Sequence, residues 1–308
     1  MPEGVLSYLM FGDAAAIQCG LALMAGGLAS MFWLRHGASS WARGVAQASR
    51  RSFIIGAGIT LVASVAALWF QAAAMGDVAL ESAGSMVAMM VRETHYGHAW
   101  STGFAALVAA GIVMAASRRL FVPVGALGLA TFMLTRSVVS HAGVDGDFSL
   151  KILVDWTHLV FVCLWVGMVF LGAFIAFRQG PNTQVDAADS AVWVSSLSEA
   201  ATVALVGIVS TGALKVWWAT PSIAQLVASS YGGVLLVKLL LVGAAAGLGG
   251  VNRFFVMPAL LGGLQGTARR EPNLQRRFVR VLRMEALVLL LVFVAAAILS
   301  GTPNPGEG

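Results

Sequence analysis

The chain has 308 residues, of which 58% are hydrophobic and only 11% are charged. An ordinary soluble domain carries roughly 25% charged residues, so a single water-facing globule could not hide this much apolar surface. The composition excludes a typical soluble enzyme and indicates a chain whose solvent is largely hydrocarbon. The net charge of +5 does not indicate a nucleic-acid partner, because Arg also collects in the cytoplasmic loops of membrane proteins.

Eight apolar runs recur along the chain, each near or above the ~20 residues that a helix needs to cross a bilayer. Backbone groups in lipid must pair within their own segment, and the period-two alternation of barrel strands is absent. We therefore expect an all-α polytopic membrane protein, a single bundle of about eight transmembrane helices, with residues 1–308 forming one domain. The expected spans are Asp13–Leu34, Ser52–Ala74, His95–Ala116, Val122–His141, Leu150–Phe177, Ala200–Trp218, Tyr231–Val251 and Val281–Ser300. Between the second and third spans, Glu81–Glu93 is too short and too polar to cross, and predicts a surface helix.

Arginine is concentrated in alternate connections between these spans. It clusters after the first, third and seventh runs, whereas the opposite connections hold mainly Asp and Glu. The positive-inside rule then predicts that both termini are periplasmic. The connection after the fifth run is the exception, because Arg178 is its only cation.

With this orientation, four of the five histidines fall in the outer leaflet. His95 and His98 open the third span and share a helix face, His141 closes the fourth, and His158 lies within the fifth. Neutral imidazole is the commonest protein ligand for Cu and Zn, so these residues are candidate metal ligands. The alternative for an interfacial histidine is simple hydrogen bonding to headgroups or backbone. His158 differs, because it and Asp155 form a polar pair inside a span, which is costly and usually faces a cavity or a partner.

Further ionisable residues lie within the expected spans: Arg136, Lys215, Lys238 and Glu285. Such residues either form buried ion pairs that fix the register of the helices or line a path for ions, and the sequence leaves both alternatives open. The two cysteines, Cys19 and Cys163, lie in apolar runs and predict no disulfide. Motifs of nucleotide-dependent and hydrolytic enzymes are absent, so we expect neither an ATP-driven pump nor an enzyme.

Several short motifs occur in a specific order in the second half of the chain. They begin with Ser140-His141-Ala142, continue through Asp155-Trp156-Thr157-His158-Leu159 and Leu164-Trp165-Val166-Gly167, and include Ser210-Thr211-Gly212. Tyr231-Gly232, Val237-Lys238-Leu239, Asn252-Arg253 with Pro258, and Arg283–Glu285 complete the set. Over about residues 94–305, this ordered set resembles the copper resistance protein D (CopD) family.

The resemblance implies an eight-span bacterial inner-membrane protein that handles copper beside a periplasmic copper carrier of the CopC type. By position, His141, Asp155 and His158 are the family-like polar residues. His95 and His98 depart from the family's pattern, whose Thr, Gly and Trp are present here as Thr94, Gly97 and Trp100.

We therefore expect a copper transporter that carries copper from the periplasm to the cytoplasm. His95, His98 and His141 would form an entry site, and His158, oriented by Asp155, would be a deeper relay. Two alternatives stay open. The same histidines could ligate haem in an electron-transfer protein, or the chain could be a copper-binding sensor or assembly factor that does not transport.

Overall fold

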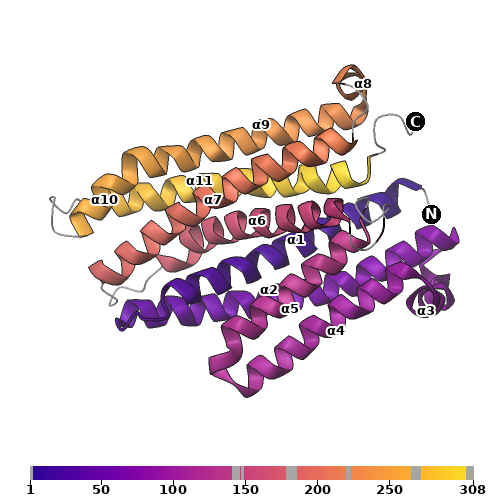
Figure 1. Ribbon diagram of the computed structural model, residues 1–308, viewed down its shortest axis with the longest axis horizontal. Coiled ribbons are helices and arrows are strands. Elements are labelled where there is room, and N and C mark those ends of the chain that lie inside the picture. The colour runs from indigo at the N-terminus through magenta and orange to yellow at the C-terminus, as the bar shows by residue number, and fades with distance from the viewer. Residues whose placement is uncertain are drawn as a thin grey trace.

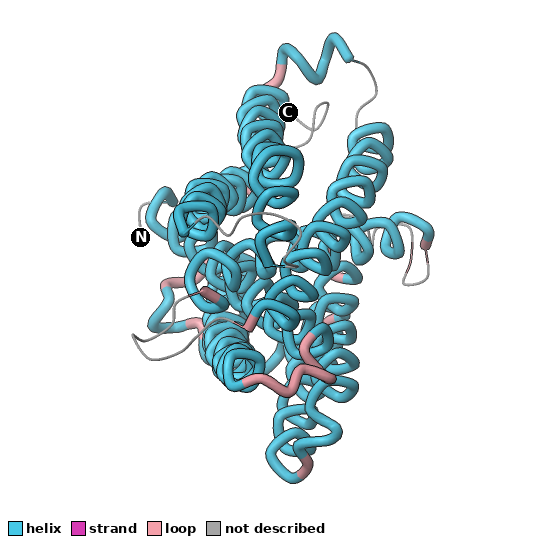
Figure 2. The backbone as a smooth tube through the Cα atoms, turned by 90° about the vertical axis from the view of Figure 1, so that its left-hand side faces the viewer, coloured by secondary structure: helices cyan, strands magenta, loops and turns pink. Residues whose placement is uncertain are grey.

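The computed structural model describes residues 3–140, 146, 149–177, 186–219, 223–264 and 272–302, and within them the chain is helical with no strand (Figures 1 and 2). The long helices are α1 (Glu3–Trp33), α2 (Ser40–Gly76), α4 (His95–Ala116), α5 (Phe121–Val138), α6 (Leu150–Leu171), α7 (Ala187–Ala219), α9 (Ser230–Val251) and α11 (Pro272–Ser300). The shorter helices are α3 (Gly84–Glu93), α8 (Ile223–Ala228) and α10 (Met257–Leu264). Two 3₁₀ turns, η1 (Leu80–Ser82) and η2 (Arg118–Leu120), precede α3 and α5, and π-helical turns η4 (Gly172–Ala176) and η5 (Asn252–Val256) extend α6 and α9.

Eight helical segments in the described residues are long and apolar enough to cross a membrane, which confirms the expected number of spans. The beginning of α1 and the end of α11 lie at the same end of the bundle (Figure 1). We call this the terminal end, and the opposite end, where α2 and α11 begin, the basic end.

Several helices extend beyond the spans expected from hydropathy. The observed α2 begins at Ser40 instead of near Ser52, and α7 begins at Ala187 instead of near Ala200. Hydropathy detects only the apolar part of a helix, whereas hydrogen bonding continues until a cap ends it. For α2 the cap is Ser39, whose side chain accepts a hydrogen bond from the Ala42 amide.

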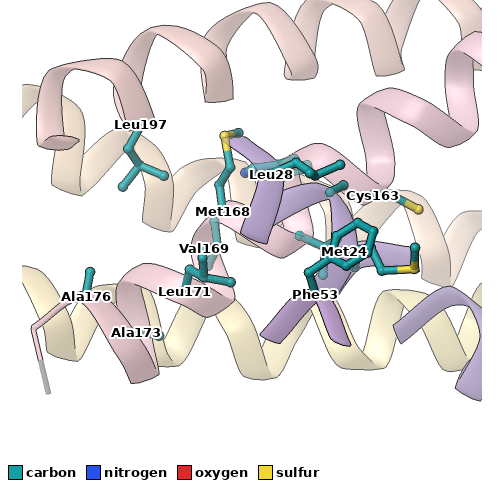
Figure 3. Packing of buried hydrophobic residues seen from close by; sticks show 14 of the residues in the cluster. Met24, Leu28, Phe53, Cys163, Met168, Val169, Leu171, Ala173, Ala176 and Leu197 are labelled. Atoms are coloured by element: carbon teal, nitrogen blue, oxygen red, sulfur yellow. The ribbon is translucent and has the colours of Figure 1, made fainter. Parts of the chain in front are cut away.

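Helices α1 and α6 pack with their backbones in direct contact. A Cβ atom added to Gly167 on α6 would overlap the carbonyl oxygen of Ala22 on α1, and one added to Gly26 would overlap the Gly167 backbone. Small residues allow this close approach between membrane helices, which have little hydrophobic driving force between them. Around the contact, buried side chains such as Met24, Phe53 and Met168 fill the core (Figure 3).

The span Ser230–Leu264, which α9 begins, lies at the periphery of the bundle. Only 11% of an 18-residue apolar stretch of this span is buried. Its exposed leucines, among them Leu236, Leu239 and Leu240, form a surface suited to lipid. Near its end, η5 finishes two residues before Pro258. A π-helical turn there accommodates a proline that cannot donate the usual backbone hydrogen bond.

Candidate functional site

The main polar cluster within the bundle lies between the antiparallel helices α6 and α7. Asp155 forms an ion pair with Lys215, and one turn further along α6 the ring of His158 contacts Thr211. One more turn brings Phe161 against Gly207. These three pairs form a ladder in which each step on α6 is three residues, or about 4.5 Å along the helix.

Glycines on α7 allow the two helices to approach at the ladder. A Cβ atom added to Gly207 would overlap the ring of Phe161. At Gly212 an added Cβ would lie 3.4 Å from Cε1 of His158, so the ring rests directly against the backbone of α7. The histidine is therefore held by packing as well as by hydrogen bonding.

The hydrogen bonds around Thr211 favour one tautomer of neutral His158. The Thr211 hydroxyl donates to the carbonyl oxygen of Gly207 at 2.5 Å, so its proton is not available to the histidine. Nδ1 of His158 lies 2.8 Å from Thr211 Oγ1, and with the hydroxyl proton directed to Gly207, Nδ1 is the donor in that bond. The Ile208 carbonyl, on the same turn of α7, is also an acceptor close to the ring. With the proton on Nδ1, Nε2 carries the lone pair that a metal ion requires.

Asp155 was expected to orient His158, and this role stays a prediction. Its carboxylate pairs with Lys215, and the hydroxyl of Ser140 lies 3.5 Å from Oδ2. Thr211 is the residue that sequence reasoning missed. It was part of a family-like motif, but a threonine in an apolar helix gives no indication that its hydroxyl faces a histidine 53 residues earlier.

A second lysine approaches this cluster from α9. Lys238 lies close enough to Asp155, Lys215 and His158 for its charge to interact with theirs. The cluster thus contains two lysines and one aspartate around the imidazole. Because like charges repel strongly at low dielectric, a cation bound at His158 would depend on Asp155 remaining ionised.

The three histidines of the expected entry site are less fully defined. His98 Nε2 lies 3.0 Å from the carbonyl oxygen of Arg92, His95 is the first residue of α4, and His141 lies outside the described residues. Among the residues that the structure describes, no group of three or more His, Cys, Asp or Glu side chains is placed to hold a metal ion. The entry site therefore stays a prediction.

The remaining intramembrane residues occupy two other places. Arg136 lines a small pocket with Tyr96, Trp100 and Thr135 near the terminal end. Glu285 is buried, and its Oε1 accepts a hydrogen bond from Trp165 Nε1 at 3.0 Å. Lys215, another of the residues for which the sequence allowed an ion pair, forms one with Asp155.

Eight apolar helices with ionisable residues held between them define a multi-pass α-helical membrane protein. Two family models match the chain in succession: "Copper resistance protein D-like, N-terminal domain" over residues 5–150 and "Copper resistance protein D" over residues 191–299. The chain belongs to the copper resistance protein D family.

Two curated relatives are similar to the chain. The "Copper resistance protein D" of Pseudomonas syringae pv. tomato is 29% identical over 225 residues, which cover 67% of this chain and 69% of the relative. The "Copper transport protein CutJ" of Bacillus subtilis is 27% identical over 177 residues, which cover 57% of this chain but only 29% of the relative. No solved structure gives a significant match. Together with the eight spans, these relatives support a copper-related, multi-pass protein of the bacterial inner membrane.

Proposed function

We propose that this protein transports copper across the inner membrane, from the periplasm to the cytoplasm, with His158 as a ligand along the path. The observation that carries the proposal is the 2.8 Å contact between His158 Nδ1 and Thr211 Oγ1, because with Nδ1 as the donor, Nε2 is left as a ligand within the bundle. The names of the two relatives, one a resistance protein and one a transport protein, favour copper as the substrate.

Residues 1–308 act in this proposal as a single transmembrane domain with both termini periplasmic. The support for one domain is a continuous buried core with members from α1, α2, α4, α5, α6, α7 and α11. The support for the orientation is the concentration of arginine at the basic end. Copper would arrive from a periplasmic carrier of the CopC type and bind first at His95, His98 and His141.

The deeper step depends on His158 and on the charge of Asp155. Copper held by Nε2 would lie within range of Lys215 and Lys238, and the carboxylate of Asp155 offsets part of their repulsion. Asp155 thus acts through the electrostatic balance of the cluster, and Thr211 fixes the ring.

Copper flux into proteoliposomes, normalised to folded protein, tests the transport function. We expect His158→Ala to abolish flux, while His36→Ala, a change in the connection between α1 and α2, leaves it unchanged. Wild-type flux from folded His158→Ala would exclude the relay. Copper binding without flux in the wild-type protein would favour the binding-only alternative, and a haem absorption spectrum of the purified protein would favour electron transfer.

The entry site has its own measurement. The triple variant His95→Ala/His98→Ala/His141→Ala should bind less copper at equilibrium while remaining folded in detergent. Unchanged stoichiometry and affinity would reject this site without affecting the proposal for His158.

A further inference from the structure

A buried carboxyl group lies deeper in the bundle than the His158 cluster. Glu285 on α11 is 2% exposed and is joined to Trp165 on α6 by the 3.0 Å hydrogen bond from the indole. Trp165 lies seven residues beyond His158, or about 10 Å further along α6. On the side that faces α9, a Cβ atom added to Gly249 would lie 3.2 Å from Glu285 Oε1, so the backbone of α9 covers the carboxyl group.

The charged residues on the neighbouring segments are engaged elsewhere or are distant. On α11, Arg283 donates from Nε to the Ala173 carbonyl in η4. On η5, Arg253 donates to Ser198 of α7. Lys238 of α9 is eleven residues from Gly249, or about 16 Å along the helix.

The other packed elements add no charge to this position. On α6, Asp155 and His158 belong to the ladder with α7, and Cys163 is a neutral, buried side chain. On α1, Asp13 lies near the terminal end, where its charge interacts with that of Arg136. The segments η4 and α10 contain no ionisable side chain. Among the described residues, the indole of Trp165 is the polar group that acts on Glu285.

An isolated ionised carboxylate in such an environment is very costly, because no cation in the described part of the chain offsets the loss of its hydration. The same group carrying a proton is neutral and still accepts the indole hydrogen bond. An ionisable side chain inside a membrane domain usually marks a path for ions or protons. Glu285 therefore has the surroundings of a group that binds a proton, and not those of one half of an ion pair.

Two features lie between this carboxyl and the basic end. Asn252, three residues beyond Gly249 on α9, is 3% exposed, and its Oδ1 has no hydrogen-bond donor among the described residues. It belongs to the π-helical turn η5, and the corresponding end of α6 is the π-helical turn η4, which Arg283 contacts. Such turns are rare and occur frequently at functional sites.

We propose that Glu285 is a proton-binding residue that takes up and releases one proton in each copper transport cycle, by way of Asn252 and the two π-helical turns. The coupling rests on the proposed transport function, whereas the binding of a proton by Glu285 does not. Uptake converts a carboxylate to a carboxylic acid and release reverses this, with no redox change.

Infrared difference spectroscopy of the purified protein tests proton binding without any transport. We expect the C=O stretch of a buried, protonated carboxylic acid, which is lost in Glu285→Gln and unchanged in Glu199→Gln, the matched change at an exposed glutamate of α7. Trp165→Phe removes the donor to Oε1, so the band should move to higher frequency. An identical acid band in Glu285→Gln would overturn the proposal. A band that Trp165→Phe leaves unmoved would also contradict it.

Copper accumulation in proteoliposomes under an imposed pH gradient, with the membrane potential clamped, tests the coupling. For one proton per copper, the accumulation ratio should change about tenfold for each unit of pH difference. Glu285→Gln should lose this dependence while its copper affinity, measured in detergent, stays at the wild-type value. A variant that keeps the dependence would overturn the coupling. Absence of copper flux in the wild-type protein would instead overturn the proposed transport, and the infrared result would still decide proton binding.

Discussion

Asp155 on α6 and Lys215 on α7 form an ion pair across the interface that also holds His158. The Asp155 side chain is 16% exposed and that of Lys215 is 42% exposed, so the pair lies at the edge of the bundle. Lys238 approaches from α9. The pair therefore joins two helices and also sets the charge beside the imidazole.

Removal of the carboxylate charge should destabilise this interface. In Asp155→Asn, Lys215 and Lys238 face each other without an anion, and we expect a loss of unfolding free energy on the order of 1 kcal/mol, because Lys215 is partly exposed. The measurement is thermal unfolding in detergent. The double variant Asp155→Asn/Lys215→Met should recover most of the loss, and an additive result would show that the pair contributes no coupling energy.

The hydroxyl of Thr211 should affect copper affinity more than stability. Thr211→Val preserves the shape of the side chain but removes the acceptor for His158 Nδ1, which frees the ring to rotate or to change tautomer. We expect copper affinity at His158 to fall by about 10- to 100-fold, the usual scale for loss of a residue that orients a metal ligand. A competition titration with a chromophoric copper chelator measures this change.

The conservative change Thr211→Ser is the matched control, because it keeps the hydroxyl. It should retain affinity close to the wild-type value. Equal affinities for the valine and serine variants would mean that the hydroxyl does not orient the ligand.

Gly167→Ala should separate α1 from α6, because the added methyl group overlaps backbone and no side chain can move aside. Overpacking of this kind typically costs about 1–3 kcal/mol, and here we expect the upper part of that range or failure to fold. Gly247→Ala is the control: nothing lies within 4 Å of its added Cβ. In a helix that change should stabilise slightly, by up to about 1 kcal/mol. Similar thermal stabilities for the two variants would contradict the close contact of the backbones.

The predicted orientation can be tested at both ends of the bundle. Reporter fusions in the connection around Ala38 and at Ser117 should read cytoplasmic, and fusions at Asp77 and after Gly301 should read periplasmic. The physical reason is the arginine bias between alternate connections. A cytoplasmic reading after Gly301 would reverse the assignment of His158 to the outer half of the membrane.

The number of spans and the helical class follow from the sequence because both depend on local properties. An apolar run long enough to cross the bilayer must satisfy its own backbone hydrogen bonds, and a helix does so whatever its neighbours are. The location of Asp155, His158, Lys238 and Glu285 within such runs is also read directly from the chain, and so is the expectation that each needs a partner.

The choice of partners was decided only by the tertiary structure. His158 meets Thr211 across 53 residues, Asp155 meets Lys215 across 60, and Trp165 meets Glu285 across 120. Each pairing depends on how a helix is rotated about its own axis, and a helix that is apolar on all sides has no amphipathic pattern to specify that rotation. Close contacts between backbones, such as that of Gly167 with Ala22, fix the rotation and thereby bring these polar side chains together.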